Sequence, residues 1–123
     1  MLVGVDTGFF YLVRDDHPSA LKILEEETII TSSIVIYELQ KKILQRDFKE
    51  SFLLDKIEQS IYIISININI AKKAAYISHN FGIHGLDALI LSSLLQAGCK
   101  EIYTVDPHFE KFKEKDIKII LLK

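Results

Sequence analysis

The sequence predicts a single α/β domain over residues 1–123, with a mostly parallel central sheet of four to five strands flanked by helices. Short runs rich in Val and Ile alternate with longer amphipathic segments, which is typical of parallel sheets covered by helices. A length of 123 residues suits one domain that buries its own core. No repeat, linker or low-complexity tract divides the chain, so we expect one domain.

The first elements are a strand and two helical segments. Residues 2–5 are apolar and predict a buried strand. Residues 8–13 follow as a short helical turn, with aromatic side chains that pack inward. Residues 17–27 carry an apolar stripe at helical spacing and place Pro18 where a helix accepts it, at the first position.

The second strand leads into two further helices. Residues 28–32 form a short β-branched run, which indicates a strand. Ser32 or Ser33 then caps a helix over residues 33–46. Residues 48–59 show apolar side chains near helical spacing and predict another amphipathic helix.

A third strand and two helices closed by glycine come next. Residues 61–66 are β-branched and predict a strand. The helix expected over residues 69–82 ends on Gly82, a natural residue for a helix C-terminus. A strongly apolar helix follows over residues 85–98 and ends on Gly98.

The last segment supplies two more strands. Residues 101–106 and 117–122 are expected strands, with a turn or short helix over residues 107–114 between them. Ligands of parallel sheets bind at the carboxyl ends of the strands. Asp6 and Asp106 each follow an expected strand, so both belong at that rim.

Four acidic residues have strongly apolar neighbours: Asp6, Glu38, Asp87 and Asp106. Acidic residues are rarely buried unless they are paired or bound to a cation. Gathered in one pocket, four carboxylates repel each other and raise each other's pKa values. Hard cations such as Mg²⁺ and Mn²⁺ favour carboxylate and water oxygens, so the four acids indicate a divalent metal site.

Each acid also has a purely structural explanation. Asp6 can cap the helix that follows its strand. Asp87 can stabilise the first turn of a helix through the helix dipole. Glu38 can face solvent, and Asp106 with Pro107 is a common turn pair. The four acids together carry more information than any one of them.

With these acids in view, the chain resembles the PIN-domain ribonucleases, in particular the small VapC-type toxins of toxin–antitoxin pairs. The resemblance covers nearly the whole chain and rests on "VDTGFF", "SSIVIYEL", "GLDALILSSLLQAG" and "IYTVDPHF", in this order. It implies one PIN-like domain with an acidic pocket at the strand ends, and an endoribonuclease that requires Mg²⁺ or Mn²⁺. It also implies an RNA substrate, a homodimer and a cognate antitoxin.

The resemblance assigns roles to individual positions. Asp6, Glu38 and Asp87 occupy the positions of the three main metal-coordinating acids, and Asp106 matches a fourth, more variable acid. Thr7 and Thr104 match supporting hydroxyl positions. The sequence departs from many relatives after the fourth acid, where "PHF" replaces a further acid or Asn.

The charge distribution adds a weaker signal. The net charge is −2, so the chain is not a basic protein that binds nucleic acid by charge alone. Lys41, Lys42 and Arg46 can contact RNA phosphates or form an ordinary solvated helix face. Arg14 can contact phosphate or pair with an acid.

Cysteine content and hydropathy bear on the cellular location. Cys99 is the one cysteine, which excludes an intramolecular disulfide and fits a reducing compartment. No signal peptide or apolar run of bilayer length is visible, so we expect a cytoplasmic protein with no membrane partner.

Two alternative functions remain. The chain can be a non-catalytic PIN-like module that binds RNA or protein, or a solitary RNA-processing nuclease without an antitoxin. A short neighbouring open reading frame that encodes a DNA-binding protein would favour the toxin.

Overall fold

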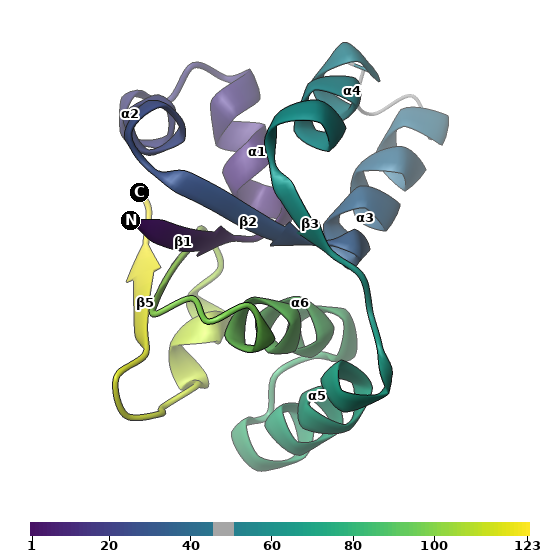
Figure 1. Ribbon diagram of the computed structural model, residues 1–123, viewed down its shortest axis with the longest axis vertical. Helices are drawn as coiled ribbons and strands as arrows, with labels where there is room; N and C mark the ends of the chain where they lie inside the picture. The colour runs from purple at the N-terminus through teal and green to yellow at the C-terminus, as the bar shows by residue number, and fades with distance from the viewer. Residues whose placement is uncertain (46–50) are drawn as a thin grey trace.

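The computed structural model describes residues 1–45 and 51–123, and it confirms the predicted α/β fold (Figure 1). In the described part of the chain the strands are β1 (Leu2–Val5), β2 (Thr28–Ser32), β3 (Tyr62–Ile64), β4 (Glu101–Thr104) and β5 (Lys118–Leu121). The helices are α1 (Thr7–Arg14), α2 (Pro18–Glu26), α3 (Ser33–Leu44), α4 (Ser51–Ser60), α5 (Ile68–Phe81), α6 (Gly85–Gln96) and the 3₁₀ helix η1 (Pro107–Lys111).

The sheet has the order β3-β2-β1-β4-β5, and every neighbouring pair is parallel. The chain builds outward from β1 through β2 and β3, then crosses to the other side of β1 for β4 and β5. The strand order therefore reverses beside β1. Ligands of open parallel sheets bind at such a reversal, outside the carboxyl ends of the strands.

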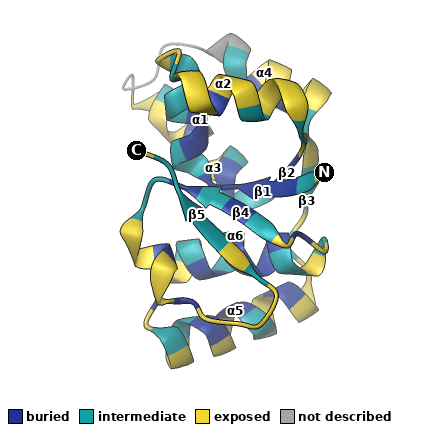
Figure 2. Cartoon of the chain, turned by 90° about the vertical axis from the view of Figure 1, so that its left-hand side faces the viewer, coloured by how far each residue is buried: buried dark blue, intermediate teal, exposed yellow. Residues whose placement is uncertain are grey.

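Helices cover both faces of the sheet. Figure 1 shows α1, α2, α3 and α4 on one side and α5 and α6 on the other, and Figure 2 shows buried residues concentrated between these layers. α6 packs directly beneath β1, where an added Cβ on Gly4 would lie 2.9 Å from a Leu94 side-chain atom. A side chain at residue 4 would therefore force α6 away from the central strand.

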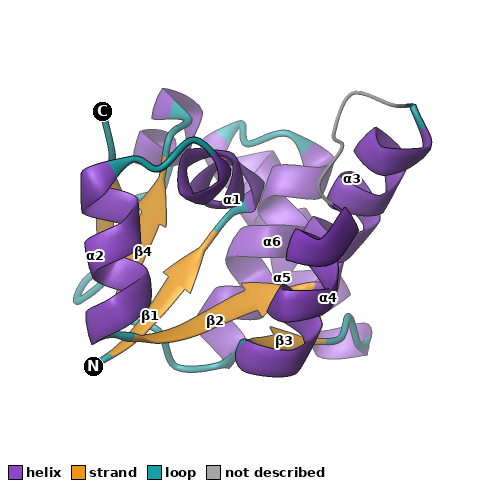
Figure 3. Cartoon of the chain, turned by 90° about the horizontal axis from the view of Figure 1, so that it is seen from above, coloured by secondary structure: helices purple, strands orange, loops and turns teal. Residues whose placement is uncertain are grey.

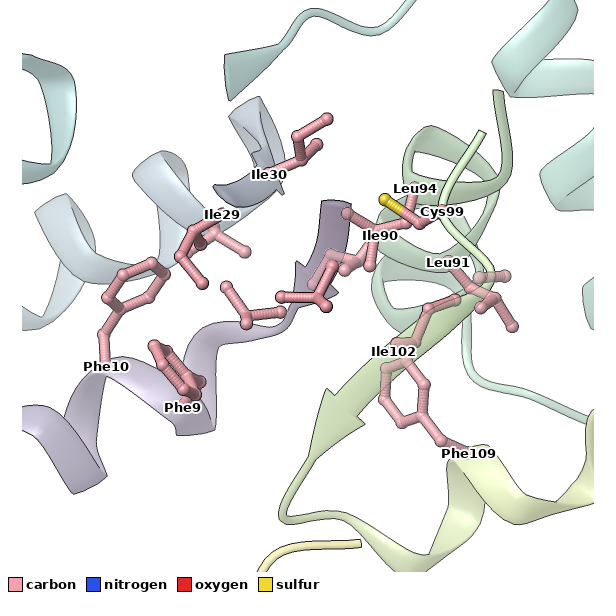
Figure 4. Close-up of a cluster of buried hydrophobic side chains, with 14 of the residues drawn as sticks. Phe9, Phe10, Ile29, Ile30, Ile90, Leu91, Leu94, Cys99, Ile102 and Phe109 are labelled. Atoms are coloured by element: carbon pink, nitrogen blue, oxygen red, sulfur yellow. The ribbon is translucent and has the colours of Figure 1, made fainter. Parts of the chain in front are cut away.

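The hydrophobic core includes side chains from the helices on both faces of the sheet and from the central strands. Side chains of α1 meet those of β2 on one face, and side chains of α6 meet those of β4 on the other (Figure 4). α6 buries most of its length because it lies between the sheet and α5. Its near-continuous apolar sequence is the expected composition for a helix covered on more than one side.

Helix boundaries follow local capping chemistry. Ser32 caps α3 by accepting a hydrogen bond from the Ile34 amide at 3.1 Å, and its hydroxyl also lies 3.0 Å from that of Ser93 on α6. Gly82 ends α5 in the left-handed conformation, with φ of 67°. The cap on α3 thus also ties the end of β2 to the opposite face of the sheet.

Some expected boundaries differ by a few residues. The turn expected over residues 8–13 is a longer helix, α1, because Asp6 caps it one residue earlier. β4 ends at Thr104 instead of residue 106, because the Asp106 amide donates to the Thr104 hydroxyl and the chain then enters η1. Residues 48–50 of the helix expected over residues 48–59 lie outside the described residues, as does Arg46.

In the residues that the structure describes, no helix combines the length and apolar character that a bilayer span requires.

Candidate active site

The four predicted acids line one cavity of about 390 Å³. This acidic cavity is lined by Asp6, Thr7, Gly8, Tyr11, Tyr37, Glu38, Lys41, Lys42, Gln45, Leu86, Asp87, Val105 and Asp106. Its residues come from the segments that follow β1 and β4 and from helices α1, α3 and α6, so it lies at the predicted rim. In Figure 3 the strands β1 and β2 run toward this end of the molecule.

Asp6 is the most buried of these acids, with 5% of its surface exposed. Its Oδ1 accepts a hydrogen bond from the Phe9 amide at 3.2 Å, which caps α1. Its Oδ2 accepts from the Thr104 hydroxyl at 2.5 Å. The structural explanation of Asp6 as a helix cap is therefore correct, and the same carboxylate also lines the cavity.

Thr104 connects the two acids that follow strands. Its hydroxyl donates to Asp6 and accepts from the Asp106 amide at 3.0 Å, and its side chain is fully buried in β4. Asp106 in turn accepts from the His108 amide at 2.9 Å and lies 2.9 Å from the His108 ring Nδ1. The turn explanation of Asp106 is thus also correct, and Thr104 fixes where that turn begins.

Glu38 and Asp87 reach the cavity from helices on opposite faces of the sheet. Glu38 is half-buried, and its Oε1 accepts a hydrogen bond from the Thr7 hydroxyl at 2.5 Å. Asp87 lies in the first turn of α6 and is also half-buried. The two predicted hydroxyl residues therefore each hold one acid, Thr7 for Glu38 and Thr104 for Asp6.

Burial and mutual repulsion change the proton affinity of the acids. Burial raises the pKa of Asp6 from 3.8 to about 6; the hydrogen bonds from Thr104 and Phe9 oppose this, and the charges of Asp87 and Asp106 add to it. Burial also raises the pKa of Asp87, as do the charges of Asp106 and Glu38, while His84 and His108 oppose the increase. The four acids thus form one electrostatically coupled group.

Gly8 lines the acidic cavity, and the sequence analysis did not identify it. A Cβ on this residue would lie 2.2 Å from Cγ2 of Val105, in the segment between β4 and Asp106. A glycine is therefore needed for α1 to approach that segment so closely. The only sequence signal is the position of Gly8 directly after "VDT".

The predicted basic residues are distributed unevenly. Lys41 and Lys42 line the acidic cavity, from the last turn of α3. Arg14 lines a different cavity of about 700 Å³, contacts Asp15 at 2.9 Å and lies over the Tyr11 ring at 5.2 Å. Arg46 lies outside the described residues, so its predicted role stays a prediction.

The donor set fits a hard divalent cation in ligand type and in charge. Its oxygens belong to carboxylates. Burial first, and then the neighbouring carboxylates, raise the pKa values of Asp6 and Asp87, and a bound cation would oppose both effects. Within the described residues, no three His, Cys, Asp or Glu side chains are close enough to hold an ion together. Mg²⁺ commonly uses only one or two protein carboxylates and completes its shell with water.

Comparison with known proteins identifies the family. The PIN domain family model matches residues 3–115, which is most of the chain. No curated protein sequence matches the chain.

Solved structures share the fold at low sequence identity. The chain is similar to a VapBC2 complex from Rickettsia felis bound to a DNA fragment from its promoter, with 20% identity, a TM-score of 0.80 and full coverage of both chains. It is similar to VapBC-1 from nontypeable Haemophilus influenzae, with 15% identity, a TM-score of 0.77 and 98% coverage of both chains. It is also similar to VapC20 from Mycobacterium tuberculosis, a Sarcin-Ricin loop cleaving toxin, with 13% identity, a TM-score of 0.72 and coverage of 94% of this chain and 98% of the other.

Proposed function

Because the chain belongs to the PIN domain family, we propose that it is an endoribonuclease that uses Mg²⁺ or Mn²⁺ to hydrolyse RNA phosphodiester bonds in the acidic cavity. The observation that carries this proposal is the convergence of Asp6, Glu38, Asp87 and Asp106 on one cavity, from four separate parts of the chain. Their mutual repulsion opposes folding, and the structural roles of Asp6 and Asp106 do not require all four acids to meet.

The proposed reaction is hydrolysis. The oxygen of water bonds to phosphorus, the bond from phosphorus to the 3′ oxygen breaks, and the 3′ oxygen takes up a proton. The products are a 5′-phosphate and a 3′-hydroxyl. A bound divalent cation would supply activation of water and neutralisation of phosphate charge.

The protein side chains have distinct tasks in this proposal. Asp6 and Asp87 would hold the main ion, and Glu38 would orient it or its water shell. Asp106 contributes when substrate arrives. A carboxylate of this group accepts the proton that the attacking water loses.

Hydroxyl and ammonium groups support these tasks. Thr104 and Thr7 hold Asp6 and Glu38 in fixed orientations through the two hydrogen bonds described above. Lys41 and Lys42 offer positive charge to the RNA backbone on the α3 side of the cavity.

We further propose that the chain is the toxin of a toxin–antitoxin pair, acts as a homodimer and is neutralised by a cognate antitoxin. The support is the similarity to VapBC complexes from several bacteria over nearly the full length of the chain. If a short open reading frame lies next to its gene, co-expression of the two proteins followed by purification tests the partner directly. Growth arrest that the neighbouring protein relieves is the expected result.

The activity is tested on a randomised pool of single-stranded RNA with Mg²⁺, with Mn²⁺ and with chelator. Asp6→Asn and Asp87→Asn variants run in parallel, and the cut ends are sequenced. We expect cleavage that requires the ion and is absent in both variants. As a matched control, Asp55→Asn changes an exposed acid on α4 outside the cavity and should leave cleavage unchanged.

Other outcomes contradict the proposal. Cleavage that persists in either cavity variant overturns the assignment of that acid. Absence of cleavage by a folded chain free of partners favours the non-catalytic binding module. Cleavage with no toxicity and no partner favours a solitary RNA-processing nuclease.

A further inference from the structure

We infer that Tyr37 is a stacking platform for an unpaired RNA base beside the cleavage site, so that the substrate must present a single-stranded nucleotide to α3. This inference rests on the proposed function, because it assigns the substrate conformation at the same cavity. It concerns a residue that the metal chemistry does not use.

The first observation is the exposure of Tyr37 at the acidic cavity. Its side chain is 52% exposed, although it directly precedes Glu38 and lines the same cavity. In the described part of the chain, its ring is absent from the aromatic pairs, which join Phe9 to Phe10 and Phe81 to Tyr76 and Phe112. Tyr37 therefore presents an aromatic surface to whatever enters the cavity.

The second observation is the order of chemical groups along α3. Lys41 lies four residues after Tyr37, which places both on one face of the helix. Lys42 and Gln45 also line the cavity from α3. This side of the cavity thus offers one aromatic ring, two ammonium groups and an amide beside the Glu38 carboxylate, while Asp6, Asp87 and Asp106 reach the cavity from the other elements.

This combination matches the chemistry of single-stranded RNA. Proteins that bind unpaired nucleic acid combine cationic groups that follow the phosphates with aromatic rings on which bases stack. A base within a duplex already stacks on its neighbours and has no free face for Tyr37. The charge arrangement therefore favours a strand that lies along α3, with its base on Tyr37 and its scissile phosphate at the acids.

The second aromatic ring of the cavity is placed differently. Tyr11 also lines the acidic cavity, but it is half-buried and the Arg14 guanidinium lies 5.2 Å from its ring centroid. One face of Tyr11 is thus already in contact with a cation. Tyr37 is the better platform of the two.

The test measures RNA binding by fluorescence anisotropy, with Ca²⁺ in place of Mg²⁺ and RNA integrity checked by electrophoresis. The probe is a short labelled RNA of mixed sequence, used single-stranded and as a duplex with its complement. The variants are Tyr37→Leu and Tyr37→Phe. Tyr62→Leu is the matched control, because Tyr62 is also largely exposed but lines the other cavity.

We expect Tyr37→Leu to weaken single-stranded binding by about tenfold, the usual effect of losing one stacked base. Tyr37→Phe keeps the ring and should stay within about twofold of the wild type, as should Tyr62→Leu. Duplex binding should be equal in all four proteins. With 2-aminopurine placed at successive RNA positions, wild type and Tyr37→Phe should quench one position that Tyr37→Leu does not quench.

Three results would overturn the inference. The first is single-stranded binding by Tyr37→Leu that equals wild type. The second is an equal loss for duplex and single strand. The third is a change of native mass in Tyr37→Leu, which would place Tyr37 in a contact between two copies of the chain.

The cleavage assay separates this inference from the proposed function. Metal-dependent cleavage that is indifferent to Tyr37 contradicts the inference and leaves the nuclease intact. Selective loss of single-stranded binding in Tyr37→Leu, without any cleavage by wild type, supports the inference and contradicts the nuclease.

Discussion

At the scale of single residues, Asp6 is a hydrogen-bonded carboxylate that is also buried, and burial opposes its charged form. Its carboxylate caps α1 and contacts Thr104, yet 95% of its surface is removed from water. Burial of the charged form costs free energy, and the raised pKa of about 6 records that cost. A residue placed for stability alone would not need to be charged here.

The stability of the ion-free protein should therefore fall as the pH rises. An unfolded Asp has a pKa near 3.8, while Asp6 in the folded protein has a pKa of about 6. Between these values the folded state retains a proton that the unfolded state has released, so stability decreases from about pH 4 to about pH 6. Thermal unfolding in chelator across this range checks the direction; a flat profile would contradict it.

Asp6→Asn should remove the free-energy cost of burying a charged carboxylate, and it should also abolish RNA cleavage. Asn keeps an oxygen that can accept from Phe9, so the cap survives without the buried charge. The amide nitrogen of Asn cannot accept from the Thr104 hydroxyl, so the expected gain is net of that lost bond. We expect the free energy of unfolding in chelator at pH 7 to increase by about 1–3 kcal/mol, with cleavage abolished. Denaturant unfolding measures the first effect, and a less stable Asp6→Asn would contradict the electrostatic argument.

Thr104→Val should show the effect of the hydroxyl group alone, because Val has nearly the same shape as Thr. The change leaves Asp6 without one hydrogen bond and the half-buried Asp106 amide without its acceptor, which we expect to cost about 1–3 kcal/mol of stability. Because the bond from Thr104 opposes the rise in the Asp6 pKa, its loss should move the pH dependence of cleavage toward higher pH. Thr104→Ser restores the hydroxyl and should behave nearly as wild type in both assays.

At the scale of elements, the strands and helices were predictable because each depends on neighbours in sequence. Ser32 and Gly82 ended elements where capping chemistry requires, and the apolar pattern of α6 indicated a covered helix. The contact between Gly8 and Val105 was not predictable, because it joins segments that only the tertiary fold brings together. The four acids were identified as a group, but the pairing of Thr7 with Glu38 needed coordinates.

Gly8→Ala tests whether the approach of α1 to the segment after β4 matters. The added methyl would lie 2.2 Å from Cγ2 of Val105, so Val105, which directly precedes Asp106, must move. We expect a loss of about 1–3 kcal/mol in stability, the usual cost of overpacking, and a large loss of cleavage.

The matched controls for Gly8→Ala use the same chain. Gly85→Ala adds a methyl where nothing lies within 4 Å, and it should leave stability and cleavage nearly unchanged. The double variant Gly8→Ala/Val105→Ala removes the overlapping methyl and should recover part of the loss. Failure of the double variant to recover would show that Val105 is not the cause.

At the scale of the whole molecule, charge limits how RNA can be held. The net charge is −2, and Lys41 and Lys42 are the described basic residues that line the acidic cavity. Two phosphate contacts predict a slope of about −1.4 for log affinity against log salt with single-stranded RNA. Anisotropy titrations at several salt concentrations measure the slope, and a much steeper value would require a larger basic surface.

The central position of β1 between β2 and β4 has a consequence for when the acidic cavity is completed. Asp6 is synthesised well before its partner Thr104, which follows 98 positions later. Contacts between such distant positions form late, after the loop between them has closed. A nascent chain that ends before β4 therefore carries three of the four acids but cannot complete the cavity. Translation itself thus delays completion of the acidic cavity until β4 has been made.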